Sequence, residues 1–302
     1  MAMSALVHVL IPFLLCIALA NTHIFDKVLV DVAYDHYAEK RVDNLPAFWQ
    51  CPFNCLINLG YILLGIYWIL QPMSDNRDTC AAVYTKDVFA LMAVTYGPVQ
   101  WVRLATLQHA PSVLDQWFTL HIFSWVLVWC HVVDKGWSSP YALMVESCSV
   151  LSYGLALFHD RGFEVALGCH IAFAVFKGVR AQVNLGDTAS MRYLCLALLS
   201  CAGFVVLKLL DHSLAEYWVF QNLTGHFWSK VCDILQFHYS FCFLTRLSEN
   251  AHNALINART FIQLSNKAMN MTCTNPNLVL SSTVILCHRH VQILMINVIK
   301  DL

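Results

Sequence analysis

Several polar and ionisable residues lie inside or at the ends of long apolar stretches of this sequence, where a charge is costly. In such surroundings an imidazole or carboxylate can hold a metal ion or relay a proton, and a cation can bind a lipid headgroup. The structural alternative is a set of ion pairs and long side chains that join helices. The candidates for either role are Gln100, Arg103, Asp115, His170, Lys208, His226 and Lys230.

The spacing of these residues gives little support for a metal site. His226 and His238 lie on one predicted helix but about 18 Å apart along it, so they cannot share an ion. His226 and Asp115 remain as weak candidate ligands, whereas a catalytic zinc site normally uses three protein ligands. We therefore predict no cofactor and assign no catalytic residue.

The composition decides the class of protein that must position these side chains. The chain has 302 residues, of which 58% are hydrophobic and 12% are charged, whereas soluble domains carry about 25% charge. A bilayer solvates apolar side chains directly, so we expect an integral membrane protein. The net charge of −1 and the lack of a basic block exclude nucleic acid as a partner. Most of the 13 cysteines lie in apolar runs without CxxC spacing and are predicted to be packing residues.

Apolar runs near the roughly 20 residues that a helix needs to cross a bilayer are frequent. Short polar connections join many of them, which favours antiparallel neighbours. We predict an all-α polytopic membrane helix bundle of seven core spans plus an N-terminal hydrophobic segment. The candidate spans are 5–20, 52–70, 88–107, 117–133, 140–158, 163–179, 193–210 and 224–244. The predicted domains are a leader at 1–22, a lumenal segment at 23–51, the membrane domain at 52–247 and a C-terminal tail at 248–302.

The two ends of the chain differ from the core. The first apolar run ends in Ala18-Leu19-Ala20, which resembles a signal-peptidase site, but it lacks a basic start. A cleaved leader and an extra span therefore both stay open. In the tail, the apolar run 276–298 is broken by His288-Arg289-His290 and is not expected to span.

The basic residues of the loops predict the orientation. Their bias places the C-terminus in the cytosol and the segment 21–51 in the lumen, with most candidate residues in the lumenal half. The rather short spans favour an endomembrane, Golgi or ER, over the plasma membrane. The cytosolic set is Arg77, Lys86, Lys135, Arg180, Arg192 and Arg246, and the lumenal set is Lys27, Lys40, Arg41 and Arg161.

Two long motifs, Tyr96-Gly97-Pro98-Val99-Gln100-Trp101 and Leu223-Thr224-Gly225-His226-Phe227-Trp228-Ser229-Lys230, resemble the transmembrane protein 187 family. The resemblance covers roughly residues 23–247 and leaves out the leader and the tail. It implies a multi-pass membrane protein without an assigned activity.

The chain more distantly resembles the seven-span intramembrane hydrolases, the alkaline ceramidases and adiponectin-receptor-like proteins. The likeness lies in Gln100–Leu107, in Asp115 and in His226–Lys230. It implies a zinc ion held by three histidines, but Leu104 and Lys230 stand at two of those histidine positions and Gln100 at a serine position.

These departures favour a non-catalytic relative of the hydrolases that binds a lipid or a membrane-protein partner. The first alternative is a zinc-dependent hydrolase of ceramide-like lipids with a rearranged site. It would use His170, His226 and Asp115 as ligands and Glu164 as base. The second alternative is a transporter. The lack of an internal repeat and of a pair of helices broken by Gly or Pro in the sequence argues against it.

Overall fold

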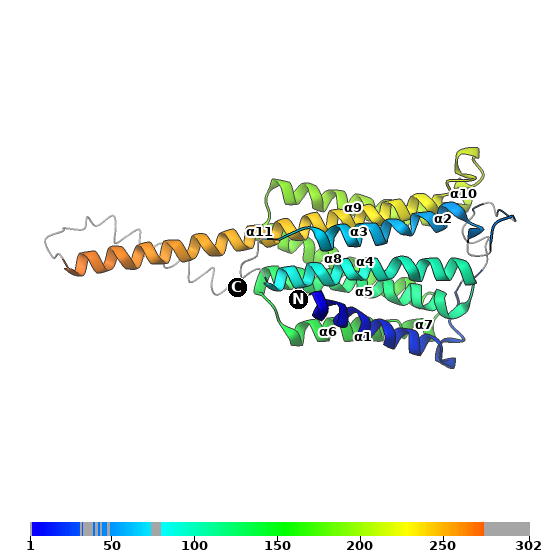
Figure 1. Cartoon of the computed structure of the whole chain (residues 1–302), viewed down its shortest axis with the longest axis horizontal. Coiled ribbons are helices and arrows are strands. Elements are labelled where there is room, and N and C mark those ends of the chain that lie inside the picture. Colours follow the sequence, from blue (N-terminus) through cyan, green and yellow to red (C-terminus); the bar gives the residue numbers. More distant parts are fainter. Residues whose placement is uncertain are drawn as a thin grey trace. The chain divides into compact units, whose positions relative to one another are not determined.

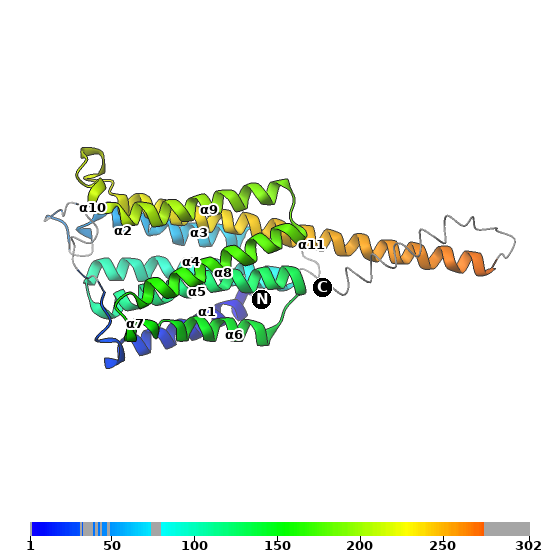
Figure 2. The same cartoon turned by 180° about the vertical axis from the view of Figure 1, so that it is seen from behind.

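The computed structural model describes residues 2–30, 32, 39, 42, 44–46, 49–73 and 80–274. By its internal contacts the chain divides into two units, residues 1–248 and residues 249–302. The first is a bundle of helices that run alongside one another (Figures 1 and 2), and the described residues contain no strand. The long helices are α1 (Ala2–Ala20), α3 (Leu59–Leu70), α4 (Cys80–Thr106), α5 (His109–Lys135), α6 (Ser139–Ser152), α8 (Gly162–Leu185), α9 (Thr188–Leu209) and α11 (Gly225–Thr274). The short ones are η1 (His23–Phe25), α2 (Pro52–Ile57), α7 (Leu155–Phe158), α10 (Asp211–Leu214) and η5 (Trp218–Phe220).

Seven helical segments of the described chain are long and apolar enough to cross a bilayer, which confirms an all-α polytopic membrane bundle. They are Met3–Ala20, Pro52–Leu70, Cys80–Thr106, His109–Lys135, Ser139–Phe158, Gly162–Leu185 and Thr188–Leu209. The predicted last core span, 224–244, is not among these seven, although it forms the first part of α11 and packs with the other helices of the bundle. That stretch begins α11, whose His226, Lys230 and Asp233 make it more polar than a lipid-facing helix, and all three side chains are buried in the bundle.

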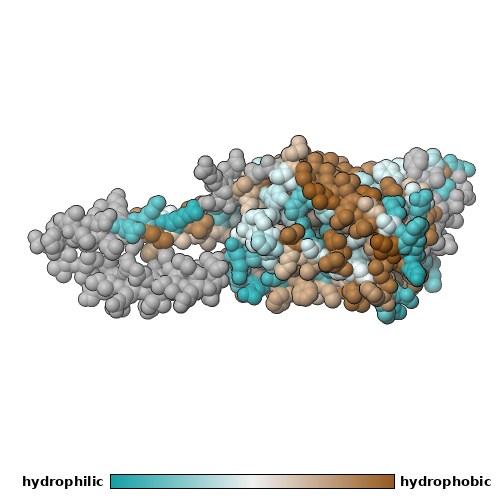
Figure 3. All heavy atoms as spheres, turned by 90° about the horizontal axis from the view of Figure 1, so that it is seen from below, coloured by the Kyte–Doolittle hydropathy of each residue, from teal (hydrophilic) through white to brown (hydrophobic). Residues whose placement is uncertain are grey.

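The outer surface of the bundle is apolar, as a bilayer requires. Large hydrophobic side chains such as Leu63 on α3, Phe176 on α8 and Leu199 on α9 are exposed. Figure 3 shows apolar side chains over much of one face of the bundle, with polar ones gathered toward its ends. Exposed leucine and phenylalanine are unfavourable in water but well solvated by lipid.

Close packing of α3 against α4 fixes the frame of the site. Gly65 allows this approach, because a Cβ there would lie 2.5 Å from the carbonyl oxygen of Ala90. Small residues at helix contacts are the usual means by which membrane helices approach closely. The first part of α11 packs beside these helices, where Phe241 stacks on Trp68 with ring centres 4.8 Å apart.

Several helices extend beyond the predicted spans. The predicted spans end at charged residues, whereas the helices continue through them. The predicted 88–107 begins at Cys80 and includes Lys86, whose Nζ donates to the backbone oxygens of Trp68 and Gln71 at 2.7 and 2.8 Å. These carbonyls at the end of α3 satisfy the ammonium, so the helix continues through it. The predicted 52–70 is interrupted at Asn58, between α2 and α3.

The N-terminal segment, for which the sequence allows a cleaved leader or an extra span, is a helix packed in the bundle. Ala5, Val9 and Cys16 of α1 are buried. Tyr84 of α4 lies 2.6 Å from His8 Nδ1, and the other ring nitrogen of His8 contacts Glu146 of α6. The predicted apolar run 276–298 lies outside the described residues.

Candidate functional site

The ammonium of Lys230 lies between three helices in the bundle core. From α11 it donates to Asn58 Oδ1 at 2.7 Å and to Gln100 Oε1 at 2.9 Å. Asn58 sits at the break between α2 and α3, and Gln100 lies on α4. Lys230 is only 5% exposed, so these two oxygens replace the water that a lysine normally keeps.

Asp115 of α5 is held by two donors from α4. Gln100 Nε2 donates to one carboxylate oxygen, and the Arg103 guanidinium donates to the other. All three residues are at most 6% exposed. Gln100 thus links the Arg103–Asp115 ion pair to Lys230 through its two amide atoms, and charge-assisted bonds of this kind are stronger than neutral ones.

Two tyrosines extend the cluster toward the apolar core. Gln100 Nε2 also donates to the Tyr96 hydroxyl at 2.6 Å, and the Tyr61 hydroxyl donates to Asp233 Oδ2 at 2.6 Å. The two rings meet edge to face with centres 5.1 Å apart. We call these residues the central network: Asn58, Tyr61, Tyr96, Gln100, Arg103, Asp115, Lys230 and Asp233. Its two cations and two carboxylates balance in charge.

The structure brings four of the seven sequence-predicted residues into this network: Gln100, Arg103, Asp115 and Lys230. The other three have different surroundings. His170 Nδ1 lies 2.8 Å from the Ala166 carbonyl of its own helix. Lys208 is exposed, with its ammonium 5.9 Å from the centre of the Phe204 ring. His226 is buried, and its backbone N–H donates to Asp211 Oδ1 at 2.7 Å.

Two further buried carboxylates, Glu39 and Asp211, were not among the candidates predicted from the sequence. Glu39 accepts bonds from the backbone N–H groups of Phe53 and Asn54 at 3.0 Å each, and so caps the start of α2. Asp211 similarly accepts the His226 N–H at the start of α11. Burial raises the pKa of Glu39 and raises the pKa of Asp211 to about 6, although these hydrogen bonds act in the opposite direction. Neither acid carries a signal in the sequence that it will bond to the start of another helix.

The residues present do not fit the zinc ion that the hydrolase resemblance implies. Both Asp115 oxygens are bonded to α4 side chains, and Lys230 places a cation beside them. Leu104, at another expected histidine position, is buried in an apolar cluster with Cys51 and Cys55. Within the described ranges, no three His, Cys, Asp or Glu side chains are grouped closely enough to hold a metal.

The fold and this network define a polytopic helical membrane protein with a charge-balanced polar core. Residues 5–245 match the model of the TMEM187 protein family. The chain is 52% identical over 247 residues to transmembrane protein 187 of Bos taurus, covering 81% of the chain and 96% of that protein. It is also 52% identical over 245 residues to the Homo sapiens protein of that name, covering 81% and 93%. The chain therefore belongs to the TMEM187 protein family.

No solved structure matches the chain. The family match also corrects one expectation, that the leader lies outside the resemblance. It begins at residue 5 and so includes nearly all of α1, in agreement with the packing of that helix. It ends at residue 245, close to the end of the first unit, and the tail follows it.

Proposed function

We propose that this protein is a non-catalytic relative of the seven-span intramembrane hydrolases, in which side-chain pairing replaces the metal centre. Its role would then be to bind a lipid or a membrane-protein partner. The observation that carries the proposal is the ammonium of Lys230, bonded to Asn58 and Gln100 beside the Arg103–Asp115 pair. Those two cations occupy the region in which the hydrolase pattern would place a metal.

Electrostatics supports this reading. Two like unit charges 4 Å apart repel by about 4 kcal/mol at an effective dielectric constant of about 20, and a divalent ion would double that value. A zinc ion beside Asp115 would face both Arg103 and Lys230 at close range. The same cations stabilise a buried carboxylate that would otherwise be costly.

A hydrolysis assay on the purified full-length protein tests the proposal. The substrates are ceramides and lipid esters in mixed micelles, and the variants are His226→Ala and, as a control, His252→Ala in the second unit. We expect no turnover above protein-free micelles for any of the three. Turnover by the wild type that His226→Ala abolishes and His252→Ala retains would instead establish the zinc-hydrolase alternative.

The transporter alternative has weaker support in the described residues. Pro98 lies inside α4, yet the helix is continuous from Cys80 to Thr106, so this proline does not create the broken helix that is typical of transporter binding sites. Flux of an ion or solute into liposomes that contain the protein would reverse this ranking.

We further propose that the protein lies in an endomembrane, Golgi or ER, with its C-terminus in the cytosol. The support is the excess of Lys and Arg at one end of the bundle, which includes Lys86, Lys135 and Arg246. The length of several spans, near 20 residues, suits a thinner bilayer.

A further inference from the structure

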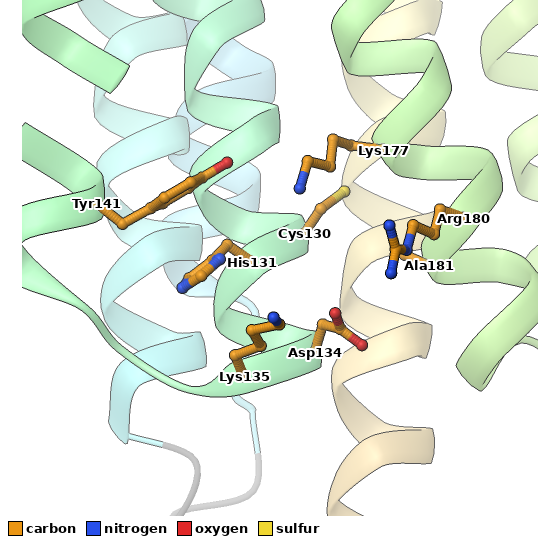
Figure 4. Close-up of a pocket in the computed structure, with 8 residues that line it drawn as sticks. All are labelled: Cys130, His131, Asp134, Lys135, Tyr141, Lys177, Arg180 and Ala181. Carbon is orange, nitrogen blue, oxygen red and sulfur yellow. The ribbon is translucent and has the colours of Figure 1, made fainter. Parts of the chain in front are cut away.

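A second polar feature lies far from the central network. A pocket with a volume of about 220 Å³ opens between the end of α5, the start of α6 and the second half of α8 (Figure 4). The side chains that matter for its chemistry are His131, Asp134, Lys135, Tyr141, Lys177 and Arg180. Lys135 is 20 residues from Asp115 on the same helix, about 30 Å along its axis, so the pocket is at the opposite end of the bundle.

The pocket is electropositive. Lys135, Lys177 and Arg180 supply three cations against the single carboxylate of Asp134. None of the three is within 4.0 Å of an acidic side chain that the structure describes. Figure 4 shows the ends of Lys177 and Arg180 directed into the space between α8 and α5. An anion there would find charge that the protein itself leaves uncompensated.

An aromatic wall forms the other side of the pocket. The His131 ring stacks on Tyr141 with ring centres 3.9 Å apart, and the Lys177 ammonium lies 6.0 Å from the centre of the Tyr141 ring. The half-exposed Trp137 lies in the adjoining loop and bonds to Ser139 Oγ at 2.9 Å. Tryptophan and tyrosine gather where a membrane meets water, so the pocket is placed at the level of lipid headgroups.

An apolar track on α8 leads to the pocket from the lipid side. Phe173, Phe176 and Val183 are 61%, 60% and 78% exposed. Together with Arg180 they follow the three- and four-residue spacing of one helix face. A molecule with an anionic head and an acyl chain would meet the cations and this apolar face at the same time.

We propose that this pocket binds the phosphate group of an anionic glycerophospholipid, with the acyl chains lying along the Phe173–Phe176–Val183 face of α8. The volume supports a headgroup as the occupant. It is several times the roughly 30 Å³ that a water molecule occupies, yet below the roughly 300 Å³ at which pockets begin to enclose drug-sized ligands. The proposal is independent of the proposed function, which concerns the central network.

Native mass spectrometry of the full-length protein tests this proposal. The detergent-solubilised protein is titrated with dioleoyl phosphatidic acid, dioleoyl phosphatidylserine or dioleoyl phosphatidylcholine, which share their acyl chains. We expect both anionic lipids to be retained at least five-fold better than phosphatidylcholine. The double variant Lys177→Gln/Arg180→Gln should lose that preference, while Lys177→Arg/Arg180→Lys should keep it.

The control variant is Lys208→Gln/Arg192→Gln, which removes two exposed cations outside the pocket. Equal retention of the three lipids by the wild type would overturn the proposal. So would a preference that persists in the glutamine pocket variant or that disappears equally in the control. Competition by millimolar inorganic phosphate as strong as that by phosphatidic acid would show a free-anion site and would refute the lipid assignment. If the glutamine pocket variant fails to fold, loss of the preference in the charge-preserving variant would contradict the proposal.

Discussion

At the scale of single residues, the central network explains how four charges are accommodated in an apolar bundle. Each cation has at least one oxygen partner and each carboxylate at least one donor, for example Lys230 with Asn58 and Asp233 with Tyr61. Breaking a buried pair leaves an uncompensated charge, which costs about 3–5 kcal/mol. The pairs are therefore coupled, and removal of both members is expected to cost less than the sum of the two single removals.

A double-mutant cycle on Arg103 and Asp115 follows from this coupling. Arg103→Gln and Asp115→Asn should each lower the free energy of unfolding by about 3 kcal/mol, because each leaves the other charge buried and unpaired. The double variant should recover at least about 1 kcal/mol relative to the sum of the two. Unfolding in mixed micelles measures all four proteins. Strict additivity would show that the two side chains do not stabilise each other.

Asp211 is expected to make the stability of the protein depend on pH. Its pKa is raised to about 6 in the fold, above the value near 4 expected in the unfolded chain. The folded state therefore binds more protons between pH 4 and 6, and stability from this group is lost as pH rises through 6. Asp211→Asn, which cannot titrate, should gain stability relative to the wild type when the pH is raised from 5 to 7. A difference in Tm that is the same at both pH values would contradict the assignment.

The sequence indicates which charged residues belong to the polar core better than it indicates their hydrogen-bond partners. A charge inside an apolar run is visible directly, which is why Gln100, Arg103, Asp115 and Lys230 were candidates. Asn58 and Tyr61 were not, because each meets a residue 172 positions away in the sequence. Other asparagines and tyrosines, such as Asn54 and Tyr153, also lie in the predicted spans, and only packing shows which of them face a charge.

At the scale of elements, α3 packs closely against α4. Gly65→Ala would place its Cβ 2.5 Å from a backbone oxygen, and backbone cannot move aside as a side chain can. We expect a loss of about 1–3 kcal/mol in the free energy of unfolding, typical of overpacking. Gly168→Ala is the matched control, because nothing lies within 4 Å of its added Cβ and alanine favours a helix by about 0.5–1 kcal/mol. Equal stability of the two variants would show that the α3–α4 contact is loose.

The sequence predicts that the helices exist, but it does not predict where each of them begins and ends. Apolar runs end at charged residues by definition, whereas the helices α4 and α5 continue through Lys86 and Asp115 because those side chains find partners. The start of α11 shows the converse. Its polar residues face the network and not lipid, so a segment packed in the bundle is less apolar than the seven spans.

At the scale of the whole molecule, the proposed orientation predicts which segments face the cytosol. If the basic end of the bundle faces the cytosol, an epitope tag placed after Leu302 should be reached by antibody when only the plasma membrane is permeabilised. A tag in the loop that follows η1, after Lys27, should be reached only after all membranes are permeabilised. The reverse pattern would place the basic pocket in the lumen and contradict the proposed orientation.

We propose that paired side chains, and not a metal, stabilise the polar core of this TMEM187 family member. The zinc content of the purified full-length protein tests this proposal, measured by inductively coupled plasma mass spectrometry after incubation with a small excess of zinc and dialysis into zinc-free buffer. We expect far less than one zinc ion per chain, with the same value for His226→Ala. One zinc ion per wild-type chain that His226→Ala removes would contradict it.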